Sequence, residues 1–109
     1  MLDKFDADNK VDENGNPTGG FVKGTGLSIE WQNGPLGRGE ERQAPNGAFV
    51  ETVIAGAKQR LEFYQTASNG KFACDENAQA IEHLANALGV LNERTQKREA
   101  AGVEGTHKP

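Results

Sequence analysis

The fold is decided by residues 75 to 101, DENAQAIEHLANALGVLNERTQKREAA. Apolar residues recur in this stretch at positions i, i+3, i+4, i+7 and i+10, namely Ile81, Leu84, Ala85, Leu88 and Leu91. This spacing places them on one face of an α-helix. Acidic residues stand in the first turn and basic residues near the last, where the helix dipole favours each: Asp75, Glu76, Arg94, Lys97 and Arg98. The pattern predicts a helix that ends around Ala101-Gly102.

A second helix is predicted just upstream, from about residue 47 to residue 65. Its apolar positions also recur at helical spacing: Phe49, Val50, Val53, Ile54, Ala57, Leu61 and Tyr64. Pro45 stops the preceding segment, and Asn46 is a candidate N-cap. Residues 66 to 71, TASNGK, are a short connector. Two helices joined this closely predict an antiparallel hairpin.

The first half of the chain is less regular. Leu27, Ile29 and Trp31 alternate with polar residues, which predicts a strand over residues 26 to 32. Residues 36 to 45 show neither helical spacing nor strand alternation of apolar residues and are expected to be a loop. Residues 1 to 20 combine acidic residues with the turn formers NGNPTGG and are interpreted as a mobile arm. The expected class is α+β: an N-terminal strand or strands, then an antiparallel two-helix hairpin. The expected segments are 1–20, 21–45 and 46–109, the last including a C-terminal tail.

Composition limits the classes of function. A formal net charge of −4 disfavours binding to DNA, and no window approaches the ~20 apolar residues of a membrane span. The single cysteine, Cys74, excludes an internal disulfide and suits a reducing cytosol. A chain of 109 residues has a limited core, and the apolar faces of strand and hairpin exceed what one subunit covers. We therefore expect an oligomer; the alternative is a monomer whose strand folds over its own hairpin.

No motif for catalysis or metal binding has the required spacing. Asp6 begins a calcium-loop-like run, but Val11 replaces the turn glycine and Pro17 the final acidic ligand. His83 and His107 lie in different elements, and Cys74 has no nearby histidine to act as its base. We expect no catalytic residue, no metal and no cofactor, and hence no enzyme.

A set of recognition residues remains around the hairpin. Phe63, Tyr64 and Phe72 flank its turn, and Asn77 stands in the first turn of the second helix. Arg94 and Arg98 are one helical turn apart near its other end. Aromatic rings, an amide and guanidinium groups suit a nucleotide, although such aromatics are more often core and such arginines more often solvated. About 25 Å of helix separates Asn77 from Arg94, so a shared site requires two chains.

Four separated segments resemble a known phage family. They are NGAFVE (46–51), RLEFYQ (60–65), KFACDEN (71–77) and LNERT (91–95) with Arg98 and GVEGTH (102–107). They look like the family called Thoeris anti-defence protein one over residues 21 to 107, including the segment GLSIEWQNGP (26–35). The hairpin alone also resembles the shorter anti-CBASS sponge protein two.

This resemblance implies a sponge that binds and sequesters a cyclic nucleotide immune signal without cleaving it, in the cytoplasm of the infected bacterial host. The implied ligand is glycocyclic ADP-ribose, and some relatives also take cyclic dinucleotides or trinucleotides. Family members form dimers or hexamers, and a hexamer is expected here. The alternative is a structural or protein-partner module that presents an apolar helical groove.

The resemblance also implies individual roles. Tyr64 would stack on the base with Phe63 beside it, Asn77 would contact a base or ribose, and Arg94 a phosphate with Arg98 nearby. A loop arginine of the family falls on Arg38, with Arg42 as the other candidate. Tyr64 stands where a relative can have phenylalanine, and residues 68 to 70 lengthen the turn.

Overall fold

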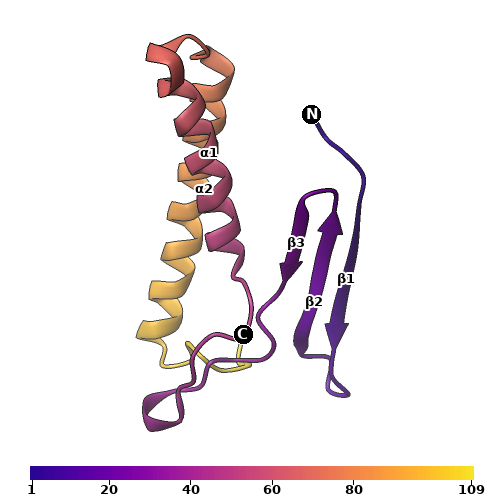
Figure 1. Ribbon diagram of the computed structural model, residues 1–109. Helices are drawn as coiled ribbons and strands as arrows, with labels where there is room; N and C mark the ends of the chain where they lie inside the picture. Colours follow the sequence, from indigo (N-terminus) through magenta and orange to yellow (C-terminus); the bar gives the residue numbers. More distant parts are fainter. The chain divides into compact units, whose positions relative to one another are not determined.

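The computed structural model describes residues 1–109, and it contains three strands followed by two helices (Figure 1). The strands are β1 (Phe5–Val11), β2 (Pro17–Gly24) and β3 (Leu27–Glu30). A short 3-10 turn, η1 (Gly39–Glu41), precedes the helices α1 (Val50–Gly70) and α2 (Asp75–Ala100). The expected α+β class is therefore confirmed. The chain divides into two compact units: a sheet unit of residues 1–49 and 98–109, and a hairpin unit of residues 50–97.

The sheet is an antiparallel meander in the order β1-β2-β3. Asp8 of β1 lies opposite Phe21, and Val22 of β2 lies opposite Ile29. The two longer strands approach each other closely at Gly20, whose φ is 141°, and a Cβ there would collide with the carbonyl oxygen of Asp8. This close pairing requires glycine at position 20.

Residues 1–20, interpreted as a mobile arm, contain regular structure that the sequence pattern did not predict. They contain all of β1 and the first part of β2, and β2 runs through the expected boundary at residue 20. The reason is physical: every residue of β1 is exposed, so the strand forms through backbone hydrogen bonds and leaves no buried face in the sequence. Of the turn formers NGNPTGG, residues 14–16 lie in the hairpin turn between β1 and β2, and residues 17–20 are the start of β2.

The strand expected at residues 26 to 32 is confirmed as β3. After it, Trp31 forms an isolated parallel bridge with Ala48. The amide of Ala48 donates to the Glu30 carbonyl over 2.7 Å, and the amide of Gln32 donates to the Ala48 carbonyl over 3.0 Å. The residues before α1 thereby occupy part of the outer edge of β3. The segment expected to be a loop, residues 36 to 45, contains η1 as its only regular element.

The hairpin unit consists of α1 and the part of α2 up to Lys97, and the two helices run antiparallel (Figure 1). Regular geometry in α1 ends before Ala67, because Ser68 and Asn69 are left-handed, with φ of 52° and 58°. This agrees with the connector expected from residue 66. The turn is closed by the Gln65 amide, whose Nε2 donates to the Cys74 carbonyl over 3.1 Å and whose Oε1 accepts from the Cys74 amide over 3.0 Å.

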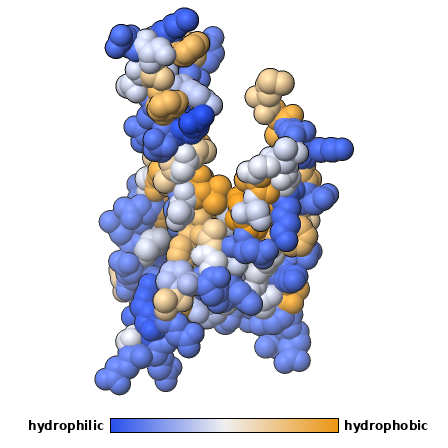
Figure 2. Space-filling model, viewed as in Figure 1, coloured by the Kyte–Doolittle hydropathy of each residue, from blue (hydrophilic) through white to orange (hydrophobic).

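No residue of the chain is buried. On α2 the half-buried residues follow one stripe, which contains Asn77, Ala80, Ile81, Leu84, Ala87, Leu88, Leu91, Thr95 and Arg98. Ala85, expected on that stripe, is exposed. Several large apolar side chains remain in solvent, and Figure 2 shows apolar patches among hydrophilic ones on the surface. Neither helix is long and apolar enough to cross a membrane.

Candidate functional site

Three side chains at the end of α1 form one surface cluster, here called the aromatic platform: Arg60, Phe63 and Tyr64. The guanidinium carbon of Arg60 lies 4.9 Å from the Phe63 ring centre and 5.0 Å from the Tyr64 ring centre. Its Nε also donates a hydrogen bond to the Tyr64 hydroxyl over 3.2 Å. Helical spacing of three and four residues produces these contacts directly.

The two rings of the platform are open to solvent. Phe63 is 45% exposed and Tyr64 is 39% exposed, and their centres are 5.9 Å apart at an interplanar angle of 53°. Two exposed rings beside a cation can stack a planar base and hold an anionic group next to it. Phe72, 56% exposed, is a further aromatic in the hairpin turn.

Asn77 lies in the first turn of α2, just after the hairpin turn that follows the platform. It is half-buried and continues the apolar stripe of α2, four residues before Ile81. The apolar stripe predicted for the second helix began at Ile81, but position 77 has the same helical phase as residues 81, 84 and 88. A change at Asn77 therefore alters a half-buried position of α2 as well as any ligand contact.

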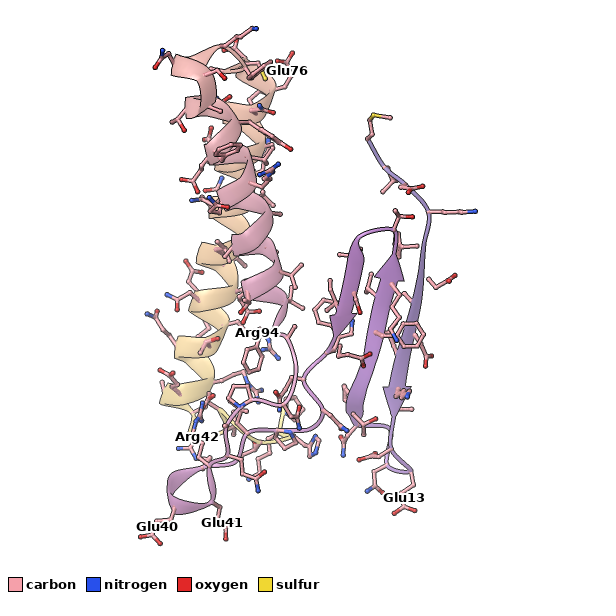
Figure 3. The ribbon with its side chains drawn as sticks, viewed as in Figure 1. Glu13, Glu40, Glu41, Arg42, Glu76 and Arg94 are labelled. Carbon is pink, nitrogen blue, oxygen red and sulfur yellow. The ribbon has the colours of Figure 1, made fainter.

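Arg94 is exposed near the other end of α2. Figure 3 shows Glu76, next to Asn77 in sequence, at one end of the hairpin and Arg94 toward the other. Because α2 is one continuous helix from Asp75 to Ala100, Asn77 and Arg94 lie on the same helix near opposite ends, and the platform and Arg94 do not meet within one hairpin unit.

The remaining predicted arginines lie in the sheet unit and form a second group, the arginine cluster: Arg38, Arg42 and Arg98. Its centre is Glu104, in the C-terminal tail. Arg42 binds the Glu104 carboxylate through both terminal nitrogens, over 2.7 and 3.1 Å. Arg38 donates to the Glu104 backbone carbonyl over 2.8 Å. A shallow pocket of about 170 Å³ lies among Arg38, Gly39, Arg42, Glu99 and Glu104.

Arg98 organises the tail. Its Nη2 donates to the carbonyls of Val103 and Thr106, both over 3.1 Å, and its Nη1 donates to the Lys108 carbonyl. These bonds fold residues 103–108 around the end of α2, where the Glu99 carbonyl accepts from the amide of Gly102 and the Arg98 carbonyl from the amide of Val103, each over 3.0 Å. Arg98 therefore supports the tail, although it was expected beside Arg94 in the ligand site.

The cluster shifts two ionisation equilibria. The hydrogen bond from Arg42 lowers the pKa of Glu104, partial burial opposes that shift, and the charges of Arg42, Arg38 and Arg98 add to the lowering. The same hydrogen bond and charge from Glu104 raise the pKa of Arg42. Glu104 is thus an anion held among three guanidinium groups, which is the electrostatic environment that a phosphate also needs.

The structure therefore divides the predicted residues into three places. Phe63 and Tyr64 lie together with Asn77 at the turn end of the hairpin, Arg94 lies toward the other end, and the arginine cluster lies in the sheet unit. Arg60 was missed by sequence reasoning, although its spacing to Phe63 and Tyr64 was a usable signal. No group of three or more His, Cys, Asp or Glu side chains in the chain is arranged to hold a metal ion.

The fold and these two clusters define a small α+β protein, a β-meander followed by a helical hairpin, with exposed aromatic and guanidinium groups. Over 81 residues the chain is 42% identical to Thoeris anti-defense 1 of Bacillus phage SBSphiJ7, an alignment that covers 74% of this chain. No family model matches the sequence. By this identity the chain belongs to the Thoeris anti-defense 1 family. The alignment covers 52% of that relative, so the chain spans about half of its length.

Proposed function

We propose that this protein counters the Thoeris defence of a bacterial host by binding and sequestering its cyclic nucleotide signal, glycocyclic ADP-ribose, without cleaving it. The observation that carries the proposal is the 42% identity to a protein named for anti-defence against Thoeris. The site residues add chemical support, because an aromatic platform, an amide and several guanidinium groups match a base, a ribose and a pyrophosphate.

The proposed binding mode uses two chains. The platform and Asn77 of one hairpin would take the base and ribose, and Arg94 of another chain would take the pyrophosphate. Support comes from the helix length between Asn77 and Arg94, about 25 Å, which exceeds the reach of one small ligand. The absence of any buried residue also supports association, because the half-buried stripes and exposed Phe72 and Val90 leave apolar surface for other copies.

The proposal gives Tyr64, Asn77 and Arg94 no catalytic role, because none of them is a nucleophile paired with a base. Sequestration lowers the free signal by mass action, which requires tight binding and no turnover. Cyclic dinucleotides or trinucleotides, suggested by the resemblance to anti-CBASS proteins, form a second set of probes.

Calorimetric titration with glycocyclic ADP-ribose tests the proposal. The unmodified chain should bind with a defined stoichiometry, and Arg94→Ala should weaken binding about ten- to more than a hundredfold, because a charge-assisted contact contributes about 1.5–3 kcal/mol. Lys97→Ala removes a nearby exposed cation of α2 and is the matched control; it should bind like the unmodified chain.

Asn77→Ala needs a companion measurement because Asn77 is half-buried. Its circular dichroism and assembly size should match the unmodified chain while its affinity falls. If all variants bound with equal affinity, Asn77 and Arg94 would not be ligand contacts. No heat of binding for the unmodified chain, with any of the cyclic nucleotides, would reject the sponge and favour a protein-partner module.

A further inference from the structure

Strand β1 has a free outer edge. It is the first strand of the order β1-β2-β3, it has seven residues, and all seven are exposed. The other edge strand, β3, has four residues and is partly covered by Ala48 at Glu30. Long exposed edges invite pairing with another strand and are usually blocked. The irregularity between Lys10 and Val11 does not block this edge, because the extra residue, Thr18, belongs to β2.

The hydrogen-bond pattern of the sheet shows which groups of β1 face outward. The amide of Trp31 donates to the Gly20 carbonyl over 3.0 Å, so Gly20 and every second residue after it bond toward β3. Phe21 and Lys23 consequently bond toward β1, through their partners Asp8 and Asp6. The N–H and C=O groups of the alternate residues, Phe5, Ala7 and Asn9, point away from β2.

The side chains of β1, FDADNKV, are self-complementary in an antiparallel arrangement. When Asp8 is placed opposite Asp8 of a second copy, Asp6 faces Lys10 and Phe5 faces Val11, each pair occurring twice. Just outside the strand, Lys4 faces Asp12, also twice. This register also places Ala7 opposite Asn9, so that outward-facing backbone groups meet outward-facing groups and complete the ladder.

We propose that β1 pairs antiparallel with β1 of a second copy of this chain, with Asp8 at the two-fold axis, and joins two three-stranded sheets into one of six strands. The single like-charge pair, Asp8 with Asp8, is flanked by the Lys10 side chains and is outnumbered by four opposite-charge pairs. This surface shares no residue with the proposed ligand contacts and does not depend on them.

The neighbouring registers that keep the same hydrogen-bond pattern are worse. Centring the pair on Ala7 places Asp6 opposite Asp8 and Lys4 opposite Lys10, which gives four like-charge pairs. Centring it on Asn9 keeps Asp8 opposite Lys10 but places Asp6 opposite Asp12 twice. The charges therefore select one register for pairing with a second copy. An unrelated peptide would pair equally well only if it had the same order of acidic and basic residues along its strand.

A cysteine scan tests the pairing and its register together. Ala7→Cys, Asp8→Cys and Asn9→Cys are each made in the full chain with Cys74→Ser, oxidised, and analysed by non-reducing electrophoresis. At the two-fold axis the facing Cα atoms of residue 8 are about 4.5 Å apart, as in a non-hydrogen-bonded pair. That distance permits a disulfide, whereas residues 7 and 9 face each other and their own copies lie beyond the ~7 Å limit.

The expected result is a disulfide-linked dimer that dominates for Asp8→Cys and stays minor for both neighbours. In the Asp8→Cys background, Lys10→Glu should reduce the linked fraction, and adding Asp6→Lys should restore it by re-creating the opposite-charge pairs. Preferential linkage at residue 7 or 9, or equally low linkage at all three positions, would overturn the proposal. Circular dichroism of each reduced variant confirms that the fold is retained.

Discussion

At the scale of single residues, Arg60 holds the aromatic platform together through both rings and the Tyr64 hydroxyl. We predict that Arg60→Ala weakens binding of glycocyclic ADP-ribose about tenfold, because the rings lose their cation and a charge beside the stacked base disappears. Arg60→Lys should restore little, since an ammonium group lacks the planar face of guanidinium.

Lys58→Ala is the matched control on the same helix, because Lys58 pairs only with Glu62 on the surface, at 3.1 Å. Surface pairs of this kind contribute about 0–1 kcal/mol. Calorimetric titration of the three variants decides the role of Arg60. Full affinity in Arg60→Lys, or an equal loss in Lys58→Ala, would contradict the assignment.

The Glu104 contact gives a pH dependence whose sign follows from its lowered pKa. The carboxylate stabilises the tail fully above the ordinary glutamate pKa of about 4.3, and that contribution is lost as the pH falls through the lower folded-state pKa. Amide exchange at residues 103–106, measured across acidic pH, should show protection falling in this window. In Glu104→Gln the same amides should lack this transition; an identical pH profile in both chains would show that another group controls the tail.

The site was predictable where a contact depends on nearby residues and less so elsewhere. Phe63 and Tyr64 follow from helical spacing, and Arg60 could have followed from the same spacing. The role of Arg98 depends on where the tail carbonyls fold, and the grouping of Arg38 and Arg42 around Glu104 joins residues more than 60 positions apart in sequence. Single-sequence periodicity contains no information on such contacts.

At the scale of elements, two glycines of the hairpin unit allow a test of its backbone conformation by substitution with alanine. Gly70 has a φ of 82° and a Cβ there would make only ordinary contacts, so Gly70→Ala should destabilise the hairpin through backbone strain alone, by about 1–2 kcal/mol. Gly56, within α1, has open space around its Cβ. Gly56→Ala should therefore stabilise by about 0.5–1 kcal/mol.

Thermal unfolding at one fixed protein concentration measures both changes. The melting temperatures should move in opposite directions, by roughly 4–8 °C per kcal/mol for a chain of this size. A shift of the same sign in both variants would contradict the left-handed turn at Gly70 or the helical, solvent-facing position of Gly56.

Elements with one apolar face were predicted well, and elements without one were missed. The stripe on α2 and the alternation in β3 indicated both elements correctly. Strand β1 contains Asp6, Asp8 and Lys10 and buries nothing, so its pattern resembles that of a solvated segment. Its formation depends on backbone pairing with β2 and on the close approach at Gly20, which composition does not reveal.

At the scale of the whole molecule, association is the main expectation. Because no residue is buried, we predict an assembly larger than a dimer, with a hexamer as the expected size. Light scattering during size exclusion, at several micromolar concentrations, measures it. A monomer at every concentration would contradict both the predicted assembly and the proposed binding site shared by two chains.

Sequestration with the signal kept intact is the central claim, and recovery of the ligand tests it most directly. The protein is saturated with glycocyclic ADP-ribose, freed of unbound ligand, incubated for hours and then denatured by heat; mass spectrometry and activation of the signal's receptor enzyme quantify what is released. We expect full, stoichiometric recovery of intact ligand at every time. A loss that grows with incubation would show cleavage, and no retained ligand would show that the protein does not sequester this signal; either result would contradict sequestration of an intact signal.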